Sequence, residues 1–246
     1  MSQQKRLRIF AGPNGSGKST IINIVKEHGI DIGVYVNADE IKKEFEKSNF
    51  LNFELFGLLI QDKELKAELK SSTFYDIKKN YEILSAIVVD NNKLHCFQKQ
   101  YFDFISTFVA DFIRNKLLGN CVKFTFETVM SHSSKIEFMR KAVESGYKTY
   151  LYFVSLEDPE LNKERVRARV ELKGHNVPED KIVSRYYRTM DLLFDALRIV
   201  DQAYFFDNSG SKSVFFAKYV ASEIEIEEPD KVPQWFYTYV LDKIIV

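Results

Sequence analysis

Short apolar runs alternate with amphipathic segments along most of the chain. Residues 6–10 form the first run, and Ile21, Ile22 and Val25 follow at the spacing of one helix face. Similar runs end near Val36, Phe126, Ser155 and Phe206. Strands that alternate with helices predict a largely parallel sheet flanked by helices on both faces, an α/β fold that binds ligands beyond the strands' carboxyl ends.

Residues from about 47 to 118 break this alternation. They are rich in Phe, Tyr, Leu and Lys, with helical spacing over 51–59 and again over 104–113. The run 87–90 resembles an acidic strand end at Asp90, but it continues a helical pattern, which favours a helix terminus. The pattern thus predicts one domain over 1–246 with a helical insertion, and plain packing of its aromatic residues is the simplest role for that insertion.

Composition narrows the function classes. Lys plus Arg and Asp plus Glu number 35 each, so the protein lacks the net positive charge that would favour binding of a long polynucleotide. No run reaches the roughly 18 apolar residues of a membrane span. Two cysteines make neither a disulfide framework nor a metal cluster, and we therefore expect a soluble, cytoplasmic protein.

A glycine-rich stretch after the first strand carries the strongest chemical signal. It comprises Gly12, Pro13, Asn14, Gly15, Ser16, Gly17, Lys18, Ser19 and Thr20. Strand, loop and helix follow in the order of a phosphate-binding Walker A loop, whose backbone N–H groups cradle a polyphosphate. Lys18 would reach the β- and γ-phosphates, and the Ser19 hydroxyl would bind Mg²⁺. The sequence thus predicts ATP and Mg²⁺ binding.

Two acidic residues follow predicted strands at the same sheet edge. Asp39 is our candidate for the base that deprotonates an acceptor hydroxyl, with a plain helix N-cap as the alternative. Glu127 is expected to bind Mg²⁺ through water or to grip a substrate hydroxyl.

Several arginines lie in two helices separated by a glycine-containing break. Arg165, Arg169 and Arg185 could fold over phosphates, since a guanidinium bonds two oxygens at once, while ion pairs on a solvated face are the alternative. His175, in the break, fits a lid or substrate contact, or a structural histidine.

These segments together resemble the zeta-toxin-like P-loop kinases. The resemblance rests on Gly12 to Thr20, Asn37-Ala38-Asp39-Glu40-Ile41, Phe126-Glu127-Thr128, Arg165-Val166 with Arg169-Val170, Gly174-His175-Asn176-Val177-Pro178, Arg185-Tyr186 and Phe206-Asp207-Asn208-Ser209. It implies a P-loop kinase-like fold, phosphate binding by Lys18, a base at Asp39 and a γ-phosphate arginine at Arg169. We expect Asn37, Glu127, Thr128, His175 and Arg185 to contact the substrate.

The resemblance also implies a toxin–antitoxin role. Characterised zeta toxins phosphorylate a sugar hydroxyl of UDP-N-acetylglucosamine, so a nucleotide-sugar-like acceptor and an antitoxin partner are expected. Lys173, Val129 and the long insertion depart from the family pattern and bear on the acceptor. A kinase for RNA ends or nucleosides, and a non-catalytic nucleotide-dependent switch, remain as alternatives.

Overall fold

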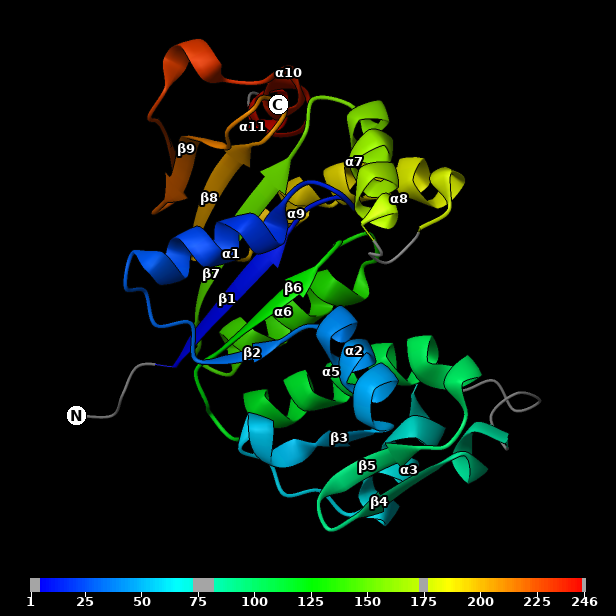
Figure 1. The fold of residues 1–246 in the computed structure, drawn as a ribbon. Coiled ribbons are helices and arrows are strands. Elements are labelled where there is room, and N and C mark those ends of the chain that lie inside the picture. The colour runs from blue at the N-terminus through cyan, green and yellow to red at the C-terminus, as the bar shows by residue number, and fades with distance from the viewer. Residues whose placement is uncertain (1–4, 73–81, 173–176, 245–246) are drawn as a thin grey trace. The chain divides into compact units, whose positions relative to one another are not determined.

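The computed structural model describes residues 5–72, 82–172 and 177–244 (Figure 1). The chain divides into two compact units. The first unit contains residues 1–32 and 125–246, and the second unit contains residues 33–124. Each unit is built around buried apolar side chains of its own.

A central sheet forms the first unit, with the strand order β10-β9-β8-β7-β1-β6. Its strands are β1 (Arg6–Ala11), β6 (Phe124–Thr128), β7 (Lys148–Ser155), β8 (Gln202–Asp207), β9 (Val214–Val220) and β10 (Glu223–Ile226). The pairs β1–β7 and β7–β8 are parallel, whereas β8–β9 and β9–β10 are antiparallel. The predicted α/β fold is therefore confirmed, with an antiparallel hairpin at one edge.

Helices cover both faces of this sheet. They are α1 (Lys18–Glu27), α6 (Ser134–Glu144), α7 (Pro159–Glu171), α8 (Glu179–Asp191), α9 (Leu193–Leu197), α10 (Gln234–Phe236) and α11 (Asp242–Ile244). A π-helical turn, Tyr237–Leu241, joins the last two. Figure 1 shows α1 in front of the sheet and α6 with α9 behind it. The C-terminal segment after Pro233 is thus helical, in three short pieces.

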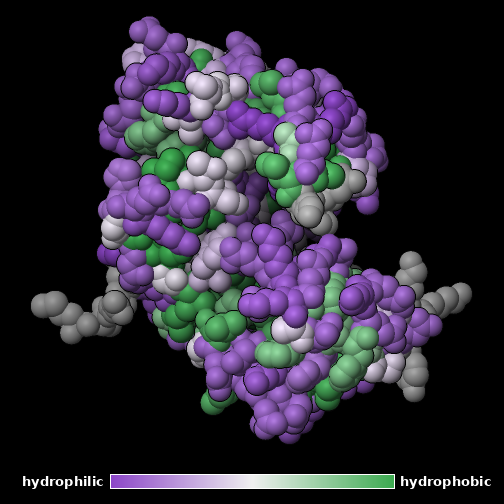
Figure 2. Space-filling model, in the orientation of Figure 1, coloured by the Kyte–Doolittle hydropathy of each residue, from purple (hydrophilic) through white to green (hydrophobic). Residues whose placement is uncertain are grey.

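Successive side chains of a strand point to opposite faces, and β1 has buried residues on both, with Leu7 and Ile9 on one face and Phe10 on the other. Leu7 and Ile9 of β1, Leu151 and Phe153 of β7 and Phe205 of β8 are all fully buried. Each such side chain contributes about 1.5–3 kcal/mol on burial. Apart from Ile24, the outward-facing residues of α1 are polar, and the face drawn in Figure 2 is mostly hydrophilic with scattered hydrophobic patches.

The second unit contains helices and a small sheet. Its helices are α2 (Ala38–Ser48), α3 (Asp62–Ser71) and α5 (Phe102–Gly119), and its strands are β2 (Val34–Val36), β3 (Phe50–Asn52), β4 (Ile87–Asp90) and β5 (Lys93–Cys96). The helices α2 and α5 pack together, with Phe45 stacked on Phe102 at 5.6 Å between ring centroids. Phe53, Phe108 and Phe112 are buried beside them.

The prediction that residues 47–118 are helical is wrong for part of this range. The strands β3, β5 and β4 form an antiparallel sheet in that order, and Asp90 ends a strand, not a helix. Asn91 and Asn92 have φ of 47° and 59°, the conformation of a tight hairpin turn. Asn92 also fixes the turn, since its side chain accepts from Ile60 N–H and donates to Leu58 O. The helix predicted over 104–113 is confirmed as part of α5. The prediction of a single domain over 1–246 stays a prediction.

The chain leaves the first unit and returns to it at one place. The Thr125 hydroxyl donates to the carbonyl of Ile32 at 2.6 Å, which ties the two crossing points together within the first unit. In the second unit, Val34 N–H donates to the carbonyl of Lys123 at 3.1 Å. Among the described residues, no helix has the length and apolar character needed to span a membrane.

Candidate functional site

The glycine-rich loop joins the buried strand β1 to α1, as the sequence predicts. Three of its glycines have a positive φ: Gly12 at 149°, Gly15 at 76° and Gly17 at 92°. A Cβ on Gly12 would lie 2.0 Å from the carbonyl oxygen of Val154. The backbone therefore passes too close to β7 for any side chain, and a tight cradle of main-chain atoms results.

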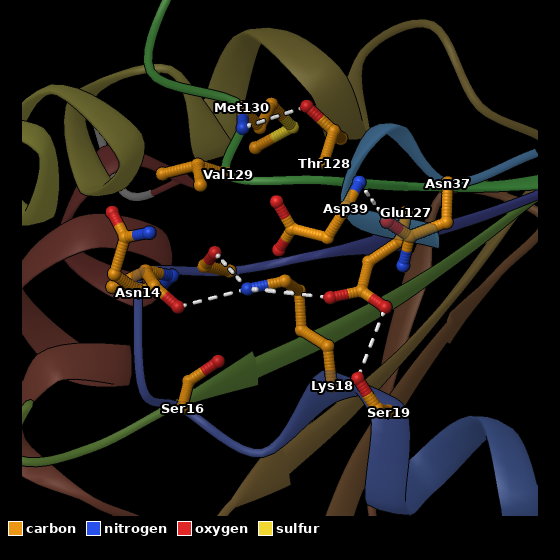
Figure 3. Close-up of polar contacts among 12 residues, drawn as sticks. Asn14, Ser16, Lys18, Ser19, Asn37, Asp39, Glu127, Thr128, Val129 and Met130 are labelled. Carbon is orange, nitrogen blue, oxygen red and sulfur yellow. Dashed lines mark hydrogen bonds and ion pairs between the residues drawn. The ribbon is translucent and has the colours of Figure 1, made fainter. Parts of the chain in front are cut away.

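Lys18, the first residue of α1, is buried and folds back toward this loop. Its Nζ donates to the carbonyl oxygens of Gly12 and Pro13, at 2.9 Å each, as Figure 3 shows. The same atom lies 4.0 Å from Oε1 of Glu127. The ammonium group is thus held at the mouth of the loop, where the sequence analysis expected a phosphate-binding cation.

Glu127 faces the start of α1 from the adjacent strand β6. Its Oε2 accepts a hydrogen bond from the Ser19 hydroxyl at 3.2 Å, and its side chain is 15% exposed (Figure 3). A hydroxyl and a carboxylate are hard oxygen donors of the kind that Mg²⁺ prefers. These two residues therefore fit a Mg²⁺ site, which the sequence predicted from Ser19.

Thr128, a predicted substrate contact, ends β6. Its hydroxyl oxygen accepts from Met130 N–H at 3.0 Å and fixes the turn that follows the strand. Met130 adopts a φ of 59° in this turn. The Thr189 hydroxyl of α8 donates to the carbonyl of Val129, so the turn is also held from a neighbouring helix.

The predicted arginine hairpin is present as the helices α7 and α8. Val166 of α7 packs with Val177 and with Ile182 of α8, which joins the two helices. Arg169 and Arg185 are half-buried on α7 and α8 respectively. Arg167 of the same hairpin pairs with Glu179 on its surface, as the solvated-face alternative describes, and the roles of Arg169 and Arg185 stay predictions.

Arg165 has a role that the sequence analysis did not foresee. Its Nη2 donates to the carbonyl oxygens of Asn208 and Gly210, which follow β8. Arg165 thereby ties α7 to the segment after the last parallel strand. His175 lies outside the described residues.

Asp39 and Asn37 belong to the second unit. Asn37 caps α2, since its Oδ1 accepts from Asp39 N–H at 2.8 Å (Figure 3). The helix-cap alternative for Asp39 is therefore wrong, because Asn37 occupies that position. The Asp39 side chain is exposed in the first turn of the helix.

Two asparagines that hold the loop were missed as site residues. Asn162 of α7 donates to the carbonyl of Asn14, and Asn208 donates to that of Ser16. Only the position of Asn208, just after a core strand, could have revealed it, since strand ends meet at one edge of a parallel sheet.

Carboxylates also gather beside Asn208. Asp207 accepts from the Trp235 indole N–H at 3.1 Å, and Glu157 accepts from Gln234 N–H at 3.2 Å, which attaches the C-terminal helices to this edge. Loss of surrounding water, followed by the charge of Asp207, raises the pKa of Glu157 above its ordinary value.

Comparison with known proteins finds solved structures of similar fold. No protein-family model matches the chain. A Haemophilus influenzae protein, itself uncharacterized, is 34% identical over 65 residues, which are 26% of this chain and 46% of that protein. A crystal structure of AvrRxo1-ORF1:-ORF2 with ATP matches with a TM-score of 0.57 and 16% identity, over 93% of this chain and 62% of that chain.

A structure of the PezAT chromosomal toxin-antitoxin system of Streptococcus pneumoniae matches with a TM-score of 0.47 and 17% identity, over 86% of this chain and 72% of that chain. The chain spans 62% of the matched chain of the AvrRxo1 structure and less than half of the Haemophilus protein. At 16% identity the likeness to the AvrRxo1 structure concerns the fold, and it agrees with the mixed α/β fold with a mostly parallel sheet that the sequence predicted.

Proposed function

We propose that this protein is an ATP- and Mg²⁺-dependent kinase that phosphorylates a hydroxyl group of a small metabolite. A nucleotide sugar such as UDP-N-acetylglucosamine is the leading acceptor class, and the toxin of a toxin–antitoxin pair is the proposed biological role. The observation that carries the proposal is the single carboxylate, Glu127, that faces both Lys18 and Ser19 of a complete phosphate loop.

The residues of the loop fit a bound triphosphate. A Cβ at Gly12, Gly15 or Gly17 would clash with neighbouring protein atoms, so glycine is needed for this loop conformation. The Ser16 hydroxyl is buried without a hydrogen-bond partner among the described residues. Such an orphaned hydroxyl costs stability unless a ligand satisfies it. The AvrRxo1 structure that shares this fold holds ATP, which supports the choice of nucleotide, and it contains a second protein, which supports an antitoxin partner.

Each residue then has a definite task. Lys18 would exchange the carbonyls of Gly12 and Pro13 for phosphate oxygens, with little movement of its buried stem. Mg²⁺, when bound, supplies positive charge against the phosphate oxygens. Ser19 and Glu127 would hold that ion, directly or through water.

Asp39 is proposed as the base. Its carboxylate would take the proton of the acceptor hydroxyl as the oxygen bonds to the γ-phosphorus and the bond to the departing ADP breaks. Arg169 would stabilise charge on the transferring group, and Asn37, Thr128, His175 and Arg185 would contact the acceptor.

The test is transfer of label from γ-labelled ATP to a metabolite extract, with the product identified by mass spectrometry. Wild-type protein should label one class of metabolite, and Lys18→Ala should reduce the rate by about 10²–10³, as loss of one charged donor does elsewhere. Lys26→Ala, an exposed lysine of the same helix, is the matched control. Equal labelling by wild-type and Lys18→Ala protein would refute the proposal.

A further inference from the structure

Two asparagines from outside the glycine-rich loop each hold one of its carbonyl groups. Asn162, fully buried in α7, donates from Nδ2 to the carbonyl oxygen of Asn14 at 2.6 Å. Asn208, just after β8, donates from Nδ2 to the carbonyl oxygen of Ser16 at 2.8 Å. Two peptide groups of the loop are therefore fixed in orientation by side chains from distant parts of the chain.

The orientation of those carbonyls determines that of two N–H groups. A trans peptide is planar, with its C=O and N–H pointing in opposite directions, and the described chain contains no cis peptide. The N–H groups of Gly15 and Gly17 consequently point away from the asparagines. Neither donates a hydrogen bond to any residue in the described part of the chain. Backbone N–H groups presented in this way form an anion-binding nest.

Both asparagines pack directly against glycines of the loop. A Cβ on Gly15 would lie 2.8 Å from the carbonyl oxygen of Asn162, and one on Gly17 would lie 2.2 Å from Nδ2 of Asn208. Glycine at these positions thus allows the asparagines to reach the loop carbonyls.

Asn208 is itself held from two further elements. Its backbone N–H donates to the carbonyl of Ser155 at the end of β7, at 2.9 Å. Its carbonyl accepts from Nη2 of Arg165 in α7. The amide group that aligns the loop is therefore fixed to a buried strand and to the arginine hairpin at the same time.

We propose that Asn162 and Asn208 are positioning residues that turn the Gly15 and Gly17 N–H groups toward the polyphosphate of the nucleotide. The proposal rests on the proposed function, because the anion is taken to be the triphosphate of ATP. Without the two amide donors, these peptide groups can rotate, and the nest loses its preorganisation before the nucleotide arrives.

The experiment compares Asn208→Leu and Asn162→Ala with wild-type protein. Binding of ATP and of inorganic tripolyphosphate is measured by calorimetry, and thermal unfolding without ligand reports the fold. Asn23→Leu, an exposed asparagine of α1, is the matched control. We expect Asn208→Leu to weaken binding of both ligands about tenfold, because the loop loses its preorganisation, and to lower the melting temperature by only a few degrees, because one carbonyl group loses its donor.

The kinetic readout separates positioning from general loss of structure. In Asn208→Leu the KM for ATP should rise while the KM for the acceptor stays unchanged, a split that partial unfolding would not produce. Asn162→Ala should show the same split, so the proposal stays testable if one variant fails to fold. Wild-type affinity for tripolyphosphate in both variants would overturn the proposal. Absence of ATP binding by wild-type protein would instead overturn the proposed function.

Discussion

The hydroxyl of Ser19 donates to Oε2 of Glu127 at 3.2 Å, and the other oxygen of that carboxylate lies 4.0 Å from Nζ of Lys18. One acidic side chain from β6 therefore faces both loop residues with a proposed role in ligand binding, Lys18 for phosphate and Ser19 for the metal. Because the Lys18 charge is compensated by Glu127, the loop can hold a buried ammonium before any phosphate arrives.

The first prediction concerns the metal. Glu127→Gln keeps a hydrogen-bond acceptor for Ser19 but removes the negative charge. The Mg²⁺ concentration for half-maximal activity should rise about 10- to 100-fold, the usual effect of altering a group that supports a metal. Activity is measured as a function of Mg²⁺ at saturating ATP, with the exposed Glu144→Gln as control. An unchanged Mg²⁺ requirement would show that Glu127 does not assist the metal.

Asp39→Asn tests the proposed base. Because Asn37 caps α2, removing the Asp39 charge leaves the helix start intact. The kcat should fall by about 10²–10⁴, while ATP affinity stays at the wild-type value, since a base acts mainly in the transition state. Glu40→Gln, the next exposed residue, is the control. Parallel losses of kcat and ATP affinity would assign Asp39 to nucleotide binding instead.

Gly17→Ala and Gly29→Ala separate steric from conformational effects. Both glycines have a positive φ, at 92° and 73°, but only the Gly17 substitution meets a neighbour, Nδ2 of Asn208 at 2.2 Å. Both variants should lose about 1 kcal/mol of stability from the unfavourable φ. Gly17→Ala alone should also lose ATP binding, measured by calorimetry. Equal ATP affinity in the two variants would contradict this account of the loop.

Glu157→Gln gives a pH-dependent prediction. The pKa of Glu157 is raised in the folded state, so the folded protein disfavours the ionised carboxylate. The destabilisation appears as pH rises through the raised pKa and is absent below the unfolded value of about 4.3. Glu157→Gln keeps the acceptor for Gln234 N–H and should raise the melting temperature at pH 8 but not at pH 4. An equal gain at both pH values would contradict an electrostatic origin.

The sequence predicted the central part of the first unit because several signals agree there. An apolar strand, a glycine-rich loop and the periodic Ile21 and Ile22 follow one another without interruption, and local preference matches the final packing. Glu127 and Ser19 could be expected to meet, since strand ends share one edge of a parallel sheet.

The hairpin of the second unit was missed for an equally local reason. The three apolar residues before Asp90 fit a helix or a strand, and only the turn at Asn91 and Asn92 distinguishes them. Two successive asparagines that tolerate positive φ are the hairpin signal. The edge strand β10 was also missed, because its alternating Glu and Ile residues are mostly exposed and leave little apolar pattern.

The sequence contains no signal for Asn162, and for Asn208 its place just after a core strand is the one signal. Asn162 binds the carbonyl group of Asn14, 148 residues away, and Asn208 binds that of Ser16, 192 residues away. A sequence does not indicate which main-chain carbonyl group a side chain will bind. Contacts of this type appear only when the backbone of the loop is known.

The hydrogen bond between Thr125 and Ile32 joins the two points at which the chain leaves the first unit and re-enters it. Because the two crossing points already touch, a change in the length of the segment between them adds little entropic cost to closing the first unit. The part of that segment beyond α2, which holds none of the proposed site residues, can therefore differ in length among descendants of this chain while the glycine-rich loop keeps its geometry.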